Sequence, residues 1–297
     1  MIPPGAVLRL LTGGLALTAL MLPLASYASG SVSLTYQRIH IDGFESTLGE
    51  MDIGTTDTDS LILEVDYHLT NRVSISAAVP YIRKRYRGGG AHRPDLISPP
   101  QNSQFIDDGE WHSDFQDWHL GVRYLLTNDP IRIEPFVGYS SPVSDYPFFG
   151  HAAVGQDIWH FDVGAHLSYT PPLSDAYFQV SPSYVFAEET LGQSIDHWRL
   201  TLAAGYRFTD RFSARLFVMG KEGDGLEFPD DFPPPRNTYH WYQHDRLVKH
   251  NYVNAGIGMD WRASPQYSLS TAVMRMIHAD QIHIMKYAVS LTVTRAF

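Results

Sequence analysis

Charged side chains recur at every second position in many short segments of the chain, as in Glu64 and Asp66. Because neighbouring residues of an extended strand point to opposite faces, this period of two collects the charges on one face. Such a face could line a water-filled conduit and select solutes by charge. The charges could equally pair across neighbouring strands and only fill an interior. The residues predicted to lie on this inner face are Glu64, Asp66, Asp117, His119, Arg123, Arg132, Glu134, His160, Asp162, Arg199, Arg207, Arg215, Asp260 and Arg262.

Histidine could supply metal ligands, since the chain contains 14 of them. His240 and His244 share a loop with His250, and His278 and His283 flank a later turn that has methionines nearby. Histidine together with methionine would suit a soft metal such as copper. However, the His240–His244 spacing is a metal spacing only on a helix, and nothing in this stretch specifies one. The sequence therefore predicts no metal site and no cofactor.

A serine and a histidine at one rim would be typical of a lipid-hydrolysing barrel, and His112–Ser113 is the pair to consider. Adjacent residues of an extended chain point to opposite faces, so His112 cannot activate Ser113 directly. His151 or His250 could supply a base from elsewhere, but no spacing indicates either. The chain is therefore predicted not to be an enzyme.

Two long polar stretches, 86–112 and 221–250, carry aromatic residues that could recognise an organic solute. If the stretches fold inward, these rings could form a hydrophobic entrance for aromatic or aliphatic molecules. The rings could instead be the packing of the loops themselves, or contact lipopolysaccharide. The entrance residues are predicted to be Phe105, Trp111, Phe228, Phe232 and Trp241.

The overall composition excludes several classes of protein. With 22 Lys plus Arg against 32 Asp plus Glu, the chain has no surplus of cations for nucleic-acid phosphates. It has no cysteine, which excludes disulfides and thiolate metal sites.

The N-terminus carries a targeting segment. Arg9 precedes an apolar run, and Ser26 and Ala28 have the spacing that a signal peptidase prefers. The alternative, a retained anchor, is disfavoured because the run is shorter than the roughly 20 residues that a span needs. We predict a cleaved secretory signal over 1–28 and a single domain over 29–297.

The charged faces belong to alternating segments that are separated by two kinds of connection. Tight turns lie at 69–72, 127–130, 171–175, 209–211 and 263–266. Longer polar stretches alternate with them, at 42–57, 86–113, 142–156, 188–194, 221–248 and 278–282. Strands are predicted at 31–41, 58–69, 73–85, 114–126, 131–141, 157–170, 176–187, 195–208, 212–220, 249–262, 267–277 and 283–297.

This alternation of connections is typical of an outer-membrane protein. The predicted fold is all-β, a 12-stranded antiparallel up-and-down transmembrane β-barrel with short periplasmic turns and longer external loops. The face opposite the charges is apolar, with aromatic residues towards the segment ends. Because an arginine facing lipid near the midplane would cost roughly 2–4 kcal/mol, the charged face must point into the bore.

The last twelve residues, "KYAVSLTVTRAF", form a strand that ends in an aromatic residue. We expect this strand to pair with 31–41 and close the barrel. Its apolar face and aromatic end resemble the signal that barrel-assembly machinery reads on outer-membrane proteins. The predicted signal residues are Tyr287, Val289, Leu291, Val293 and Phe297.

Three stretches carry a family resemblance: "DWHLGVRYLLTND" (117–129), "PFVGYSSPVSDYP" (135–147) and "AVGQDIWHFDVGAHLSYTPPLSDAYFQVSPSYVF" (153–186). They are similar to the outer-membrane proteins of a meta-pathway of phenol degradation, small barrels related to transporters of hydrophobic compounds. The Pro-Thr-Gly-like corner of that family corresponds to 141–144, and its Gly-Thr-Gly-Gln-like motif to 153–156. The resemblance implies a transporter-like barrel and supplies no catalytic motif.

These features predict a bacterial outer-membrane channel or transporter for the passive passage of small, hydrophobic or aromatic organic molecules. The expected partners are outer-membrane lipid and lipopolysaccharide, the barrel-assembly machinery and a small-molecule solute, with no nucleic acid. The alternative is a closed structural or adhesive barrel whose external loops bind other partners. A barrel lipid hydrolase is the third and least favoured hypothesis.

Overall fold

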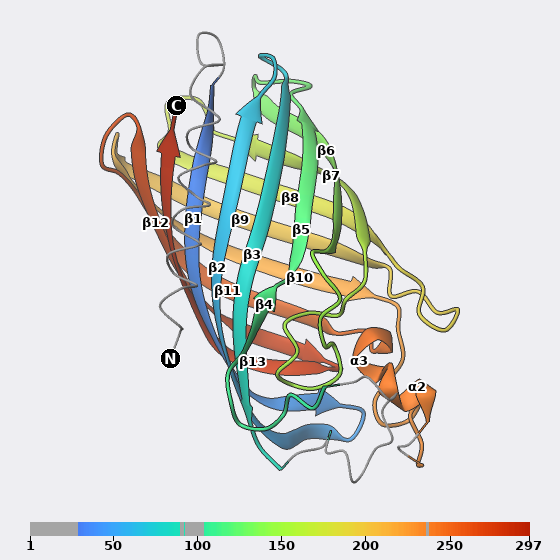
Figure 1. Cartoon of the computed structure of the whole chain (residues 1–297). Helices are drawn as coiled ribbons and strands as arrows, with labels where there is room; N and C mark the ends of the chain where they lie inside the picture. The colour runs from blue at the N-terminus through green and yellow to red at the C-terminus, as the bar shows by residue number, and fades with distance from the viewer. Residues whose placement is uncertain (1–28, 90–91, 93–103, 236–237) are drawn as a thin grey trace.

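The structure is a computed structural model that describes residues 29–89, 92, 104–235 and 238–297 (Figure 1). The predicted signal segment, 1–28, lies outside the described residues, so its cleavage stays a prediction. Residues 90–91 and 93–103 of the first long loop also lie outside them.

The described chain forms one sheet rolled into a closed barrel (Figure 1). The strands are β1 (Ser29–Ser46), β2 (Gly49–His68), β3 (Val73–Arg87), β4 (His112–Phe115), β5 (Asp117–Tyr124), β6 (Ile131–Pro142), β7 (His160–Tyr169), β8 (Ala176–Ala187), β9 (His197–Thr209), β10 (Phe212–Gly223), β11 (Asn251–Arg262), β12 (Tyr267–Asp280) and β13 (Ile282–Ala296). β4 and β5 both pair with β3, so they are two parts of one barrel strand, interrupted at Gln116. All pairings are antiparallel, and β1 pairs with β13. The predicted 12-stranded barrel is confirmed.

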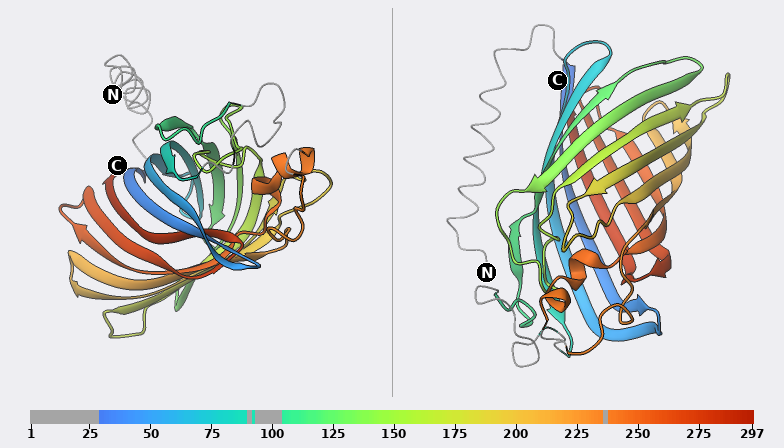
Figure 2. Two further views of the ribbon diagram at one scale, coloured as in Figure 1. Left: turned by 90° about the horizontal axis from the view of Figure 1, so that it is seen from below. Right: turned by 90° about the vertical axis from the view of Figure 1, so that its right-hand side faces the viewer.

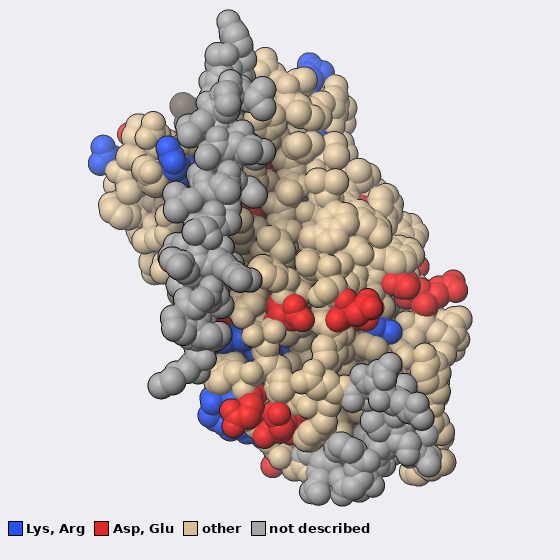
Figure 3. Space-filling model, viewed as in Figure 1, with Lys and Arg blue, Asp and Glu red and all other residues tan. Residues whose placement is uncertain are grey.

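The two faces of the wall differ as the alternation predicts. Large apolar side chains lie on the outer surface, where Leu61, Leu120, Leu202, Ile257 and Leu291 are each 40–49% exposed. Charged side chains visible in Figure 3 gather towards the two ends and leave much of the wall between them uncharged. A continuous apolar surface of this kind marks contact with another apolar phase. In a barrel with this topology that phase is the lipid of a membrane.

The pairing of β1 with β13 closes the barrel in the register that the C-terminal sequence predicts. Ser31 lies opposite Ala296, and the ladder continues to His40 opposite Tyr287. On the inner face the hydroxyls of Thr35 and Thr292 are 2.8 Å apart. Phe297 exchanges two backbone hydrogen bonds of 3.0 Å with Gly30. The C-terminus therefore remains in the sheet to its last residue.

The prediction of an external loop at 42–57 is wrong, because β1 and β2 continue as a hairpin that reverses at Thr47 and Leu48. Gly43, Gly49 and Gly54 have φ angles of 87°, 94° and 90°, conformations that other residues rarely adopt. Glycine here allows irregular pairing and a tight reversal instead of ending the strands. Similarly, the turn predicted at 278–282 is reduced to Gln281 between β12 and β13.

Two short helices, α2 (Tyr239–Tyr242) and α3 (His244–Leu247), lie between β10 and β11. Together with the long connections they gather at the end of the barrel away from the C-terminus (Figures 1 and 2). The tight turns lie at the end near the C-terminus, which is periplasmic in outer-membrane barrels. Among the described residues, no helix is long and apolar enough to cross a membrane.

The two faces of β13 predict different responses to charge at adjacent positions. Leu291→Arg places a guanidinium towards lipid and should lower the free energy of unfolding by about 2 kcal/mol or more. Thr292→Arg points into the bore and loses mainly the hydrogen bond to Thr35, so it should cost only about 1 kcal/mol. Urea unfolding in lipid vesicles measures both values. Equal losses for the two variants would contradict the assignment of the faces.

Candidate functional site

The bore carries the charged residues that the sequence places on the inner face. Each of the fourteen is adjacent in its strand to an outward-facing apolar residue, as Arg123 is to Val122 and Tyr124. Strand alternation therefore directs all fourteen inward. The structure brings them onto one continuous inner surface, while their role in solute selection stays a prediction.

Half of the inner arginines are held in ion pairs. Arg123 pairs with Asp66 across the intervening strand β3. Arg132 pairs with Glu134 at 2.7 Å. Arg215 likewise pairs with Asp260.

The remaining inner arginines have other neighbours. Arg199 donates to the Nε2 atom of His197 at 3.1 Å, and Arg207 lies over the ring of Tyr177. Ion pairing and lining of the bore thus coexist. The predicted inner set contains six arginines and six carboxylates, so these charges cancel.

Two cavities occupy the bore and share Gln37. The larger, of about 430 Å³, lies along β1, β2, β3 and β5. Its wall is apolar over most of its area, with Ile39, Ile62 and Ile82 and with Val154 from the connection above, and it also includes Lys84, Asp117 and His119. The second, of about 290 Å³, is lined by small, apolar and uncharged polar residues of β8–β10, β12 and β13 with the single cation Arg215. A molecule inside the barrel would therefore meet apolar patches between polar and charged residues.

The long connections fold together over the external mouth and form a packed plug, defined here as residues 92, 104–111, 143–159, 224–235 and 238–250. Its apolar core consists of Phe44, Phe149, Phe232, Trp241, Leu247 and Val248. Phe44 belongs to the hairpin of β1 and β2, so the extended hairpin supplies one side of this core. The plug is therefore continuous with the barrel wall.

Polar contacts join the pieces of the plug. The buried carboxylate of Asp107 accepts hydrogen bonds from the backbone N–H groups of His151 (3.1 Å) and Ala152 (2.9 Å). Arg246 donates to the Gln156 carbonyl at 2.6 Å and to the Asp157 carboxylate at 2.7 Å. These bonds connect segments that are far apart in the sequence.

The plug is also held to the wall and contains buried titratable groups. Lys84 of β3 donates to the carbonyl oxygen of Ala153 at 3.0 Å.

Burial lowers the pKa of His151 well below its ordinary value, and the neighbouring His92 and His283 add to the shift. Burial, reinforced by Lys221, lowers the pKa of His250 in the same way. His151 and His250 are therefore neutral at pH 7.

The structure separates the predicted aromatic entrance residues. Phe232 and Trp241 are only 2% and 3% exposed, and Phe228 packs against them in the plug core. Trp111 lies on the outer side against the guanidinium groups of Arg83 and Arg85, and Phe105 is half-buried. An open aromatic entrance is therefore not what the structure has. The alternative, packing of the loops themselves, describes Phe228, Phe232 and Trp241.

The pair considered for hydrolysis is not arranged as a catalytic pair. Ser113 receives a hydrogen bond from the Tyr81 hydroxyl at 2.9 Å. His112 contacts the Asp108 carboxylate at 2.8 Å. His151, one of the two other bases considered, is buried inside the plug.

An outward-facing arginine cluster was not predicted. Arg38, Arg83, Arg85 and Arg87 surround the buried carboxylates of Asp57 and Asp59 on the outer side of β1–β3, near the external end. Asp59 accepts hydrogen bonds from Tyr36 (2.8 Å), Arg38 (3.1 Å) and Arg83 (3.0 Å). A sequence signal existed, because Asp57 and Asp59 continue the outward series of Leu61 and Leu63. The stretch holding Asp57 was instead predicted to be a loop.

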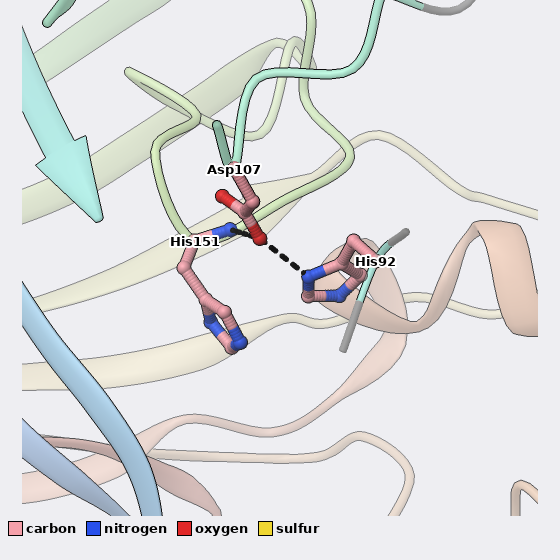
Figure 4. Close-up of side chains that lie close together, drawn as sticks. All are labelled: His92, Asp107 and His151. Atoms are coloured by element: carbon pink, nitrogen blue, oxygen red, sulfur yellow. Dashed lines mark hydrogen bonds and ion pairs between the residues drawn. The ribbon is translucent and has the colours of Figure 1, made fainter. Parts of the chain in front are cut away.

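The plug also contains residues that could hold a metal. His92, Asp107 and His151 lie together (Figure 4), as do His92, His244 and Asp245. In each group the potential ligand atoms lie within 4.8 Å of one another. Of these residues, only His244 was considered as a metal ligand from the sequence, because no local spacing connects it to His92, Asp107 or His151.

The role of Asp107 in the plug can be tested against its neighbour. Asp107→Ala removes the acceptor of several buried hydrogen bonds and should destabilise the plug locally by about 2–4 kcal/mol. Limited proteolysis should then cut 104–111 and 143–159 at least ten times faster, while the barrel stays resistant. Asp108→Ala is the control, because Asp108 is exposed and contacts only its own segment. Equal cleavage of both variants would contradict the role of Asp107.

Comparison with known proteins agrees with this architecture. An outer-membrane channel from Pseudomonas putida F1 is similar with a TM-score of 0.69 at 13% identity, covering 91% of this chain and 96% of that chain. The translocator domain of the autotransporter NalP from Neisseria meningitidis has a TM-score of 0.51 at 10% identity, with 98% and 96% covered. The NanC porin has a TM-score of 0.50 at 9% identity, with 90% and 98% covered. At these identities the likeness shows the fold of outer-membrane barrels.

The sequence comparisons identify the family. Among curated proteins, no sequence matches the chain. The model of the family described as "Putative MetA-pathway of phenol degradation" matches residues 54–225, which is more than half of the 297 residues. The chain therefore belongs to this phenol-degradation family of outer-membrane barrel proteins.

Proposed function

We propose that the protein is a passive outer-membrane channel for small, uncharged or weakly polar organic molecules, aromatic ones in particular. The observation that carries this proposal is the cavity of about 430 Å³ inside the bore, with its largely apolar wall. A cavity of about 150 Å³ already suffices to bind benzene, so a substituted aromatic ring has room here. Export by the predicted signal 1–28 is part of the same proposal.

The charges of the bore support an uncharged solute. Equal numbers of predicted inner arginines and carboxylates leave little net field along the axis, so an ion of either sign gains little from entering. The name of the family points to phenol, and the similar Pseudomonas protein is an outer-membrane channel. The family name agrees with an aromatic solute, and the similar protein agrees with a channel.

Passage requires the plug to move, because its core fills the external mouth. The Asp107 contacts and the Lys84 contact hold the plug in the closed arrangement. A solute would enter when these contacts open, pass through the apolar cavity and leave at the charged periplasmic end. The concentration gradient supplies the driving force, and no catalytic step is involved.

The rival function is a closed structural or adhesive barrel with binding loops. In that case the ion pairs and the plug only stabilise the wall. The two functions differ in conductance, since a structural barrel should stay closed after the plug is loosened.

A matched pair of arginine variants tests the channel. In planar bilayers the purified protein should give discrete conductance, increased by Asp107→Ala. Arg199→Ala removes a positive charge from the bore and should shift the reversal potential towards cation selectivity, because the bore then repels cations less. Arg38→Ala removes the same charge from the outer side and should leave the reversal potential unchanged. Absence of conductance in both the wild type and Asp107→Ala would exclude the channel.

We also propose that the outer arginine cluster binds the phosphate groups of lipopolysaccharide. Four arginines against Asp57 and Asp59 leave a net positive charge on the outer side of the external end. Arginine recognises phosphate through paired hydrogen bonds. Trp111 stacks on Arg83 and Arg85 and holds both guanidinium groups in place. Lipopolysaccharide fits this position because the external leaflet contains it.

This second proposal is tested with purified lipopolysaccharide. The double variant Arg83→Ala/Arg85→Ala should bind it about tenfold more weakly, a loss of about 1.4 kcal/mol. The control is Arg199→Ala/Arg207→Ala, which removes two arginines from the inner face instead. Binding that falls equally in both double variants would reflect general loss of charge and would contradict a specific site.

A further inference from the structure

Four histidines from distant parts of the chain meet inside the plug. His92 precedes the segment 104–111, His151 lies in 143–159, His244 is in α3 and His283 is in β13. They line a cavity of about 90 Å³ together with Asp245 and a fifth histidine, His250. The ring centroid of His92 lies 4.5 Å from that of His151 and 5.3 Å from that of His244. A buried cluster of imidazoles needs a chemical explanation.

The outer contacts of two of these rings fix which nitrogen carries the proton. The Nδ1 atom of His244 lies 2.8 Å from the carbonyl oxygen of Trp241, which can only accept. The Nδ1 atom of His92 lies 2.8 Å from the Asp107 carboxylate (Figure 4). Both Nδ1 atoms therefore donate, so in the neutral rings both Nε2 atoms carry the lone pair. Proteins orient metal-binding histidines in this way: the ring nitrogen that does not bind the metal donates a hydrogen bond to a carbonyl or a carboxylate.

The two lone-pair nitrogens face each other. The Nε2 atoms of His92 and His244 are 3.4 Å apart. Two acceptors at this distance repel unless a cation lies between them. In a tetrahedral zinc site with bonds of about 2.0–2.1 Å, neighbouring ligand nitrogens lie about 3.3–3.4 Å apart. The separation is therefore the one that two ligands of the same ion require.

A carboxylate completes the set. The Oδ1 atom of Asp245 lies 3.4 Å from Nε2 of His244. The ligand atoms of His92, His244 and Asp245 all lie within 4.8 Å of one another. The group containing Asp107 is less suitable, because the Asp107 oxygens already accept the bonds from His92, His151 and Ala152.

His151 provides a further, independent observation. Its Nδ1 atom contacts Nε2 of His283 at 2.8 Å. Its Nε2 atom is buried, and none of the described residues gives it a hydrogen-bond partner. His151 also lines the same cavity. Because His151 lines the cavity that His92, His244 and Asp245 also line, its buried Nε2 atom is a potential fourth ligand.

We propose that His92, His244 and Asp245 bind one divalent transition-metal ion of the zinc type, with His151 as the fourth ligand. Imidazole nitrogen with a carboxylate suits zinc, nickel or copper better than calcium or magnesium, which prefer oxygen ligands. The ligands come from three segments of the plug, so the ion holds these segments together. The consequence that metal closes the conduit rests on the proposed channel function, whereas binding itself does not.

Metal titration of the tag-free full-length protein in detergent tests the site. After treatment with a chelator, the protein should bind one Zn²⁺ per chain in competition with a chromophoric chelator. His244→Ala removes a ligand and should weaken binding at least 100-fold. The control is His240→Ala, a histidine of the same loop whose Nε2 atom contacts the Asp231 carbonyl outside the cavity. The His240→Ala variant should bind Zn²⁺ with the same affinity as the wild type.

Two measurements on the wild type keep the test independent of variant folding. Co²⁺ should give the intense visible bands of a tetrahedral site, and Cu²⁺ should show nitrogen hyperfine coupling in its EPR spectrum. Zn²⁺ should also slow hydrogen exchange in 104–111 and 238–250 at least tenfold without changing the barrel strands. No binding by the folded wild type, or equal affinities of His240→Ala and His244→Ala, would overturn the proposal. In the first outcome a proton shared between His92 and His244 takes the place of the metal.

Failure of this proposal and failure of the channel are distinguishable. Conductance without zinc binding leaves the channel intact and excludes the metal. Zinc binding without conductance in Asp107→Ala leaves the metal site intact and excludes the channel.

Discussion

Each peptide group within a bilayer must find its hydrogen-bonding partner inside the protein, because hydrocarbon offers none. In this chain that requirement depends on the pairing of β1 with β13, which extends from Ser31 opposite Ala296 to Glu45 opposite Ile282. Without it, two strands of 18 and 15 residues would expose open edges to lipid. Closure also assigns every second residue to the bore. The separation of inner charges from outer apolar residues follows from this single pairing.

Closure has a second consequence at the external end. Once the wall has no free edge, the long connections pack on one another, on the inner side of the wall near Ile82 and on strands that extend beyond the wall. The hairpin of β1 and β2 is such an extension, and its Phe44 enters the plug core. The plug thus obtains an apolar core of its own, apart from the bore below. Its polar groups are then buried and need partners, which Asp107 and Arg246 supply.

The fold could be predicted because its signals are local. A period of two, tight turns and an aromatic C-terminus each occupy a few adjacent residues, and they gave the strand number, the closure and the inner face. The plug could not be predicted, because its contacts have no local pattern. His92 and His244 are 152 residues apart, and Arg246 and Asp157 are 89 apart. The hairpin at 42–57 was predicted to be a loop because its glycines are typical of loops. The packing of Phe44 in the plug core, which distinguishes this hairpin from a loop, has no local sequence signal.

The two sets of arginines show how position decides the role of one residue type. Inside the bore Arg123, Arg132 and Arg215 each have a carboxylate partner, so they make the surface polar without giving it a net charge. Outside, Arg38, Arg83 and Arg85 share Asp57 and Asp59 and keep an excess of positive charge. A balanced bore cannot select strongly by charge, so in the proposed channel selection would fall to the apolar cavity and to the plug above it. Under that proposal, the contacts inside the plug would determine which molecules the barrel admits.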